Sequence, residues 1–516
     1  MNHTGTTLLV GGRIHSPAAP DATAMAVRGG TVVWVGSDET ALTRYAQADE
    51  VVRLDGAFVA PAFVDAHVHV TSAGLLLTGL DLTGCRSLAE CLRAVREFAA
   101  GHRGVIWGHG WDDSRWPEYR PPTRAELDEA AGGVPTYLSR IDVHSALVTS
   151  ALVAKVPQAR DGDGWSADGP LVRAAHHHAR RVARDSFTPD QRRAAQLAFL
   201  LHAAAEGVVS VHECAGPDIS GAEDLAALLD LITPELPEVV GYWGERGAVH
   251  RAAEMGVRGL AGDLFVDGAI GSRTAALHKP YTDAPDTCGS RYLDADEIAE
   301  HVVACTNAGL QAGFHVIGDA AASAVVDGFA KAETAVGRDA LVACRHRLEH
   351  LEMVDAGQAR RLASWGVVAS MQPLFDDAWG GPDRMYAQRL GPWRGTALNP
   401  FALLADGGLE LAFGSDAPVT QVAPWRAVRA AVRHRTEGSA ISAEAAFAAH
   451  TRGGWWAAGV TDELTGTLMP GAPAHYAVWF ISEDMPRPGL PMDNPAPRCM
   501  RTVRQGTTIF DREVHT

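Results

Sequence analysis

The stretch Phe63-Val64-Asp65-Ala66-His67-Val68-His69 follows an apolar run, Ala57-Phe58-Val59-Ala60-Pro61-Ala62. Runs of this length and composition are typical of a buried strand. His67 and His69 are two residues apart, so both imidazoles point to the same face of such a strand. Two neutral imidazoles at the end of a strand make half of a divalent-metal site, typically a zinc site. A pair of structural histidines is the alternative, because one short motif is weak support.

The composition is that of a large globular protein. The chain has 516 residues, 47% hydrophobic and 21% charged, which is enough for a barrel plus a smaller domain. The formal net charge of −17 argues against nucleic acid or an anionic membrane surface as a partner. No apolar run approaches the ~20 residues that span a bilayer. The seven cysteines are scattered without a CxxC spacing, and the N-terminus lacks a signal-peptide pattern, so we expect a cytoplasmic protein.

Strand and helix patterns alternate through the middle of the chain, which is typical of βα units. Strand patterns after residue 63 lie at 105–109, 136–140, 208–212, 264–266, 311–315, 346–350, 367–371 and 409–414. Helical patterns lie at 88–100, 190–206, 223–231, 296–308, 320–336 and 356–365. With the His67 strand the strand patterns number nine, one more than a (β/α)8 barrel needs. We therefore expect one of the two within 100–145 to belong to an insertion.

Both ends of the chain have a different sequence pattern, with short strand patterns separated by glycine and aspartate. Such punctuation is typical of hairpins in a small β domain. We predict a β-sandwich formed by residues 1–60 and 461–516, flanking a TIM (β/α)8 barrel with insertions in 61–460.

Metal-capable residues stand at the ends of four predicted strands. They are His67 and His69, His315, His350 and Asp416. The carboxyl ends of parallel barrel strands meet at one mouth, so these side chains should converge. Four histidines and an aspartate can hold one or two divalent ions, which activate water and polarise a substrate carbonyl. A carboxylate beside that water can accept its proton and deliver it to the leaving group.

The motifs resemble the signature blocks of the amidohydrolase superfamily. These blocks are Phe63–His69, His315–Asp319, Arg347–His350 and Gly414–Val419. Further segments resemble the branch that includes the N-substituted formamide deformylases, namely Gly108–Asp112, Ser139–His144 and Asp267–Ala275. The resemblance spans roughly residues 6–510. It implies a metal-dependent TIM-barrel hydrolase that cleaves a non-peptide C–N bond of a small molecule, such as an amide, N-formyl or cyclic amide group.

The resemblance also implies a role for each strand-end residue. His67 and His69 would bind one metal, and His315 and His350 would bind a second. Asp416 would bind metal and act as the general base. The expected cofactor is one or two divalent ions, with Zn²⁺ as the expected metal.

The chain departs from the family at one position. Many relatives carry a lysine four residues before the Asp-Gly pair, and its carbamate bridges two metals; here that position is Asp263. Only three lysines occur, Lys155, Lys279 and Lys331, and none stands in for it. We expect Asp263 to lie early on its strand, too low in the barrel to bridge. Glu213, at the end of a different strand, is expected to supply the bridging carboxylate, with a mononuclear site as the alternative.

Other polar residues are candidates for substrate binding. Trp111 and Asp112 are expected to line the mouth, and Arg273 to grip a substrate carboxylate or carbonyl. Arg140 and His144 are expected to form a substrate clamp, with a structural network as the alternative.

Competing functions stay open beside hydrolysis. Metal-assisted isomerisation or deamination could run in the same barrel, because fold alone does not decide the chemistry. A metal-binding protein without turnover is a third alternative, because the bridging lysine is missing, although Asp416 argues against it. We expect a small-molecule substrate and neither nucleic acid nor membrane as a partner, and a homodimer stays open. The loops that set specificity are expected within 72–190 and 375–400.

Overall fold

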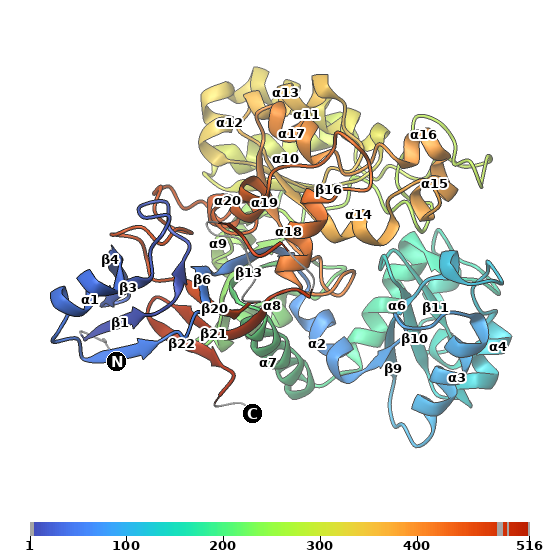
Figure 1. Cartoon of the computed structure of the whole chain (residues 1–516). Coiled ribbons are helices and arrows are strands. Elements are labelled where there is room, and N and C mark those ends of the chain that lie inside the picture. Colours follow the sequence, from blue (N-terminus) through green and yellow to red (C-terminus); the bar gives the residue numbers. More distant parts are fainter. Residues whose placement is uncertain (1–4, 482–488, 493–494, 514–516) are drawn as a thin grey trace.

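The computed structural model describes residues 5–481, 489–492 and 495–513, and Figure 1 shows the whole chain. Eight strands pair in the order β19-β18-β17-β16-β15-β14-β13-β7, and each pairing between neighbours is parallel. The strands are β7 (Phe63–Val68), β13 (Val208–Ala215), β14 (Glu238–Trp243), β15 (Gly259–Leu260), β16 (Gln311–Val316), β17 (Arg347–His350), β18 (Val368–Met371) and β19 (Glu410–Phe413). A parallel bridge between Val68 and Ala417 brings the two outer strands together. The predicted (β/α)8 barrel is confirmed.

Helices follow the barrel strands, and the sequence marks where two of the longest begin. The N-cap side chains of Thr188 and Asp294 each accept from the amide of the third helical residue, and that residue's side chain accepts from the N-cap amide. The helices are α7 (Pro189–Ala205), α8 (Ala222–Leu231), α9 (Val249–Met255), α10 (Ala295–Asn307), α11 (Asp319–Val336), α12 (Arg338–Cys344), α13 (Ala356–Ser364), α14 (Pro373–Trp379), α15 (Met385–Leu390), α16 (Pro392–Gly395), α17 (Phe401–Asp406), α18 (Pro424–Val432), α19 (Ala443–Ala449) and α20 (Arg452–Ala457). Within the described ranges, no helix has the length and apolar character needed to cross a bilayer.

An insertion between β7 and β13 forms a sheet of its own, with the order β12-β11-β10-β9-β8. Its elements, with the helix that leads into it, are α2 (Val70–Thr78), β8 (Leu80–Asp81), α3 (Leu88–Ala99), β9 (Ile106–Trp111), η1 (Asp113–Arg115), α4 (Arg124–Ala131), β10 (Thr136–Arg140), β11 (Ser145–Val148), α5 (Ser150–Val153), η2 (Pro157–Arg160), β12 (Leu171–Val172) and α6 (Arg173–Asp185). In Figure 1 this sheet stands to one side of the barrel. The expectation that one of the two strand patterns in 100–145 belongs to the barrel was wrong, because β9 and β10 pair with each other in this sheet. The missing barrel strand is β14, which the strand patterns did not include.

The two chain ends meet in a pair of packed sheets. One sheet has the order β4-β3-β1-β5, and the other, β2-β6-β20-β21-β22, takes strands from both ends of the chain. Their elements are β1 (Thr6–Val10), β2 (Arg13–Ile14), β3 (Ala24–Arg28), β4 (Thr31–Gly36), α1 (Asp38–Arg44), β5 (Glu50–Arg53), β6 (Phe58–Pro61), β20 (Tyr476–Phe480), β21 (Arg498–Arg504) and β22 (Thr507–Asp511). Leu9 and Val27 of the first sheet share one buried core with Val59 and Tyr476 of the second. This is the β-sandwich predicted from the two ends.

Candidate metal centre and active site

Six buried side chains converge where the barrel strands end. We call them the histidine–aspartate cluster, and its members are His67, His69, Asp263, His315, His350 and Asp416. Asp263 lies at its centre. One carboxylate oxygen, Oδ1, is 3.6 Å from His67 Nε2 and 3.4 Å from His315 Nδ1. The other, Oδ2, is 3.2 Å from His69 Nε2.

Two of the histidines are oriented by a side chain on their far side. His67 Nδ1 lies 2.8 Å from Glu349 Oε2, and His350 Nδ1 lies 2.8 Å from Gln372 Oε1. Each contact leaves the other ring nitrogen, Nε2, facing the cluster. Outer partners of this kind set the tautomer and the ring orientation of metal-binding histidines.

Five side-chain atoms of the cluster are buried without a hydrogen-bond partner: His67 Nε2, His69 Nδ1, His315 Nδ1, Asp263 Oδ1 and Asp416 Oδ1. Four of them, all except His69 Nδ1, lie within 3.6 Å of a ligand atom of another cluster residue. Buried polar atoms are rarely left unpaired, because the loss of hydration then has no compensation. Imidazole nitrogen and carboxylate oxygen are zinc-ligand atoms, and several triplets of these residues hold such atoms within 4.8 Å of one another. The donor set therefore fits a divalent metal.

The cluster also attracts positive charge. Burial disfavours a charged imidazole, but hydrogen bonding to Asp263 and the charge of Asp416 outweigh it and raise the pKa of His350 to about 9. The same two carboxylates raise the pKa of His69 above its ordinary value against the effect of burial. Although burial acts in the opposite direction, the facing imidazoles of His315 and His350 hold the pKa of Asp263 well below its ordinary value. A divalent cation would supply the positive charge that these carboxylates attract.

The backbone at two cluster residues is strained. Asp416 has φ +54° and His350 has φ +71°, a left-handed conformation that residues other than glycine seldom adopt. Strain of this kind concentrates at functional sites, where the surrounding structure holds it in place. The Asp416 amide donates to the His67 carbonyl at 2.8 Å. Gly414 permits this approach, because a Cβ there would lie 2.5 Å from the His67 nitrogen.

A fully buried ion pair lies deeper along β17, and we call it the Arg347 pair. Arg347 Nε and Nη2 donate to the two oxygens of Glu349 at 2.5 and 2.8 Å, and Nη2 also donates to the hydroxyl of Ser370. Burial would raise the pKa of Glu349, but the charge of Arg347 outweighs it and lowers that pKa. The pair therefore holds Glu349 ionised beneath His67.

Asp263 lies in the mouth of the barrel, and the expectation that it lies too low was wrong. Strand β15 ends at Leu260, before the apolar residues 264–266 that resembled the strand. Gly262 then turns the chain with φ +79°, so Asp263 follows the strand end instead of preceding it.

Glu213 is not drawn into the cluster. Its Oε2 accepts from the amide of Val70 at 2.7 Å, and it is absent from the groups of close ligand atoms found in the described part of the chain. Burial raises the pKa of Glu213 to about 7. The geometry favours Asp263 over Glu213 for the central anionic position.

A small cavity of about 30 Å³ opens beside the cluster, which is room for about one water molecule. His144 and Glu352 line it together with Asp416. Its other walls include Ile270, Ile317, Phe375, Trp379, Met385 and Tyr386. Residues from both predicted specificity segments, 72–190 and 375–400, thus reach this cavity.

Of the substrate-binding candidates, His144 is the one that lines the cavity. Arg140 is buried and donates to Asp112 and Asp142, each at 2.8 Å. Asp142 lines the cavity, so Arg140 and Asp112 hold a wall residue in place. This corresponds to the structural-network alternative for Arg140.

The other two candidates lie away from the cavity. Trp111 is 1% exposed, packs in the core of the insertion, and donates its Nε1 hydrogen to the Leu138 carbonyl. Arg273 forms an ion pair with Asp283 at 2.7 Å.

Other residues of the site did not stand out in the sequence. Gln372 directly follows β18, so its place after a strand end was a usable signal. Glu352 lies two residues after the end of β17, so its place was a usable signal too, whereas Tyr386 lies in α15 and has no such signal. Their side chains hydrogen-bond to each other, and burial raises the pKa of Glu352 to about 7.

A family model described as "Amidohydrolase family" matches residues 50–510. The chain belongs to the amidohydrolase family. This amidohydrolase is 28% identical over 452 residues to Protein LONG AFTER FAR-RED 3 of Arabidopsis thaliana, covering 80% of this chain and 75% of that protein. It is 24% identical over 457 residues to an N-substituted formamide deformylase of Arthrobacter pascens, covering 81% of each chain.

A solved structure extends the likeness to three dimensions. It is an uncharacterized metal-dependent hydrolase of Pyrococcus furiosus, with 26% identity and a TM-score of 0.70, and the match covers 95% of this chain and 100% of the other. The family match and these likenesses bear out the predicted amidohydrolase resemblance, with the deformylase as a distant relative. The protein is a hydrolase.

Proposed function

We propose that this hydrolase cleaves a non-peptide C–N bond of a small molecule, in an amide, N-formyl or cyclic amide group, with divalent metal bound in the histidine–aspartate cluster. The observation that carries the proposal is the set of four buried, unpartnered ligand atoms turned toward one space. Likeness to a formamide deformylase and to a metal-dependent hydrolase supports the reaction class.

The ligands fall into two sets that share one carboxylate. His67, His69 and Asp263 form one set, and Asp263, His315 and His350 form the other. We propose zinc as the metal, because imidazole and carboxylate are its usual ligands beside thiolate. When bound, such an ion lowers the pKa of water and polarises the substrate carbonyl.

Asp416 is the proposed general base. Its Oδ1 is buried, has no hydrogen-bond partner, and lies 3.2 Å from His69 Nε2 at the edge of the small cavity. There it can accept a proton from the attacking water and pass it to the leaving nitrogen as the C–N bond breaks. The remaining hydroxyl of the water ends on the carbonyl carbon, so the products are a carboxylic acid and an amine.

His144 is proposed to donate a hydrogen bond to the substrate near its carbonyl group. Its ring centroid is 4.9 Å from that of His315, and it lines the cavity. Burial lowers its pKa well below the ordinary value. A neutral imidazole can donate one hydrogen bond without adding a charge next to the metal ligands.

Metal content and turnover together test the proposal. The purified protein should contain at least one divalent ion by elemental analysis and hydrolyse members of a panel of N-formyl amines, N-acyl amines and cyclic amides. His67→Ala should remove metal and activity from a folded protein, while the matched control His250→Ala, at an exposed histidine, should keep both.

Two outcomes would contradict this assignment. Full metal content in His67→Ala would remove that residue from the ligand set. Bound metal with release of ammonia from amines, or with isomerisation and no hydrolysis of any amide, would favour the alternative chemistries.

A further inference from the structure

The small cavity beside the cluster is too small for a whole substrate. It holds about 30 Å³, whereas a second cavity next to it holds about 480 Å³, and small-molecule sites commonly measure roughly 300–1,000 Å³. Trp379 and Met385 line both spaces. We call the larger space the outer chamber. A substrate reaching the cluster with a small group would leave its remaining atoms in this chamber.

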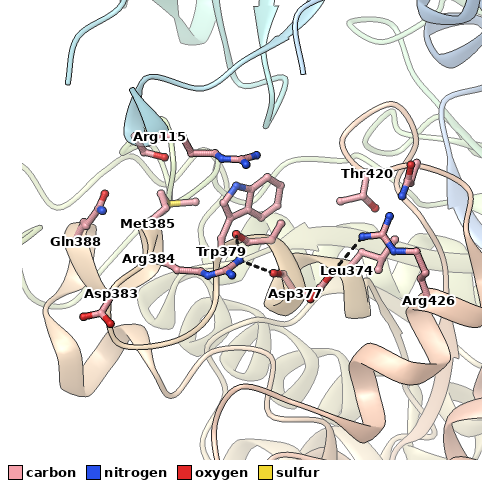
Figure 2. Close-up of a pocket in the computed structure, with 13 residues that line it drawn as sticks. Arg115, Leu374, Asp377, Trp379, Asp383, Arg384, Met385, Gln388, Thr420 and Arg426 are labelled. Atoms are coloured by element: carbon pink, nitrogen blue, oxygen red, sulfur yellow. Dashed lines mark hydrogen bonds and ion pairs between the residues drawn. The ribbon is translucent and has the colours of Figure 1, made fainter. Parts of the chain in front are cut away.

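The outer chamber is lined by residues from three parts of the chain, as Figure 2 shows. Arg115 comes from η1 of the insertion, Trp379 from α14, and Arg384 from the segment that precedes α15. In Figure 2 the Trp379 indole is drawn between the side chains of the two arginines. Insertion and barrel thus both contribute a positive charge to one hollow.

Asp377 lines the chamber, but it forms its ion pairs with two other arginines. Its carboxylate oxygens lie 3.3 Å from Arg426 Nη2 and 2.8 Å from Arg435 Nη2, so two other guanidinium groups already share it. Asp383, an exposed residue of the lining, is the remaining acid. The lining therefore holds two carboxylates, Asp377 and Asp383, against three arginines, Arg115, Arg384 and Arg426, in a protein whose formal net charge is −17.

Arg384 and Arg115 have no carboxylate partner among the ion pairs of the described residues. Arg384 Nη1 donates to the main-chain carbonyls of Asp377 and Ala378, at 2.8 and 3.1 Å. Burial and the like charges of Arg435 and Arg115 lower the pKa of the Arg384 guanidinium, although the charges of Asp377 and Asp376 oppose this shift. An anion between Arg115 and Arg384 would relieve this repulsion.

We propose that the outer chamber binds an anionic group, a carboxylate, on the part of the substrate that extends beyond the scissile amide, through Arg115 and Arg384. The guanidinium fork matches a carboxylate in two parallel hydrogen bonds. Trp379, with Met385 and Leu374 in the same lining, offers an apolar surface to the organic part between the two ends. This inference rests on the proposed function, and it narrows the substrate class to amides that carry a carboxylate.

Calorimetric binding to the metal-loaded enzyme tests the chamber without requiring turnover. The probes are hippurate, which carries an amide and a carboxylate, and hippuramide, which has the same shape without the charge. We expect wild type to bind hippurate more tightly, and Arg115→Met and Arg384→Met each to weaken hippurate at least ~10-fold, the lower range for hydrogen bonds to charged groups. Hippuramide binding should stay unchanged. Arg338→Met, at an exposed arginine outside the chamber, is the matched control.

Three results would overturn the inference. Equal hippurate affinity in wild type and both variants would mean that the carboxylate binds elsewhere, for example at the metal. Tighter binding of hippuramide than of hippurate would exclude an anionic substrate end. Inorganic phosphate that competes with hippurate as well as hippurate itself would make the chamber a site for a free anion.

Failure of the reaction assignment gives a different pattern. If wild type binds hippurate through the two arginines but hydrolyses no amide, the proposed function is wrong, while carboxylate binding in the outer chamber is supported. If neutral and carboxylate-bearing amides are hydrolysed with equal kcat/KM, and the arginine variants do not change either value, the function stands and the chamber fails.

Discussion

The Arg347 pair and the histidine–aspartate cluster are both buried in the barrel and share strand β17, but they differ in how their atoms are partnered. In the Arg347 pair, Glu349 receives hydrogen bonds from Arg347 on both oxygens and faces His67 Nδ1. In the histidine–aspartate cluster, four ligand atoms have no partner. Burial alone therefore does not distinguish a structural polar group from a binding site in this molecule. A satisfied pair supports the barrel, whereas an unsatisfied cluster indicates a site for a bound ion.

Breaking the Arg347 pair should produce the largest loss of stability. Arg347→Met removes one partner and leaves Glu349 buried without its cationic partner, which typically costs about 3–5 kcal/mol. Urea unfolding should detect this as a lower midpoint or as a failure to obtain folded protein. Arg338→Met is the control, because the Arg338 side chain is 57% exposed and surface pairs contribute about 0–1 kcal/mol. Equal losses of stability in the two variants would mean that the buried Arg347 pair contributes no more than an exposed ion pair.

Asp416→Asn should have its main effect on catalysis. The amide keeps the shape of the carboxylate but does not accept a proton at neutral pH, so kcat should fall at least ~10²-fold. Steady-state kinetics measure this drop, and urea unfolding of the same sample should show a midpoint close to that of wild type. A variant with near wild-type kcat would remove Asp416 from the proton-transfer role.

The paired variants Asp263→Asn and Glu213→Gln test which of the two carboxylates binds metal. We expect Asp263→Asn to weaken metal binding at least ~10-fold, because even outer partners of metal ligands are worth about 10–100-fold. Glu213→Gln should keep wild-type metal affinity, since its carboxylate accepts from the Val70 amide. Equilibrium dialysis with zinc measures both. Metal loss in Glu213→Gln alone would restore Glu213 as the anionic ligand.

The smallest expected effect is that of added bicarbonate, which we expect to change neither metal content nor activity. Lys155, Lys279 and Lys331 are all exposed, so the cluster has no lysine to be carboxylated. Metal content and activity should therefore be the same in bicarbonate-free buffer and in buffer with added bicarbonate. A dependence of either quantity on bicarbonate would require a carbamate and would contradict the role proposed for Asp263.

Much of the site followed from strand periodicity. His67 and His69 share a strand face because successive side chains alternate, and parallel barrel strands bring their carboxyl ends to one mouth. The structure brings these two together with His315, His350 and Asp416. The local sequence pattern was sufficient to predict these five residues, because each lies at or just after a recognisable apolar strand.

Asp263 shows where local pattern was insufficient. The apolar residues 264–266 resembled a strand, but the strand is Gly259–Leu260. Both runs contact β16, because Phe265 forms a parallel bridge with His315, but only Gly259–Leu260 pairs with β14 as well. Such pairing is not encoded in either run alone. A shift of a few residues moved the carboxylate from the expected low position to the centre of the cluster.

The amino-acid sequence by itself determined the barrel, the sandwich built from both ends, and the histidines at the strand ends, because apolar periodicity and strand direction decide all three. Only the tertiary structure decided which charged groups were free to act. Arg140 is committed to Asp112 and Asp142, and Arg273 to Asp283, whereas Arg115 has no such partner among the described ion pairs. Asp112 and Arg140 are 28 residues apart in sequence. An arginine's partner is set by which segments fold next to it, and that neighbourhood exists only in the folded chain.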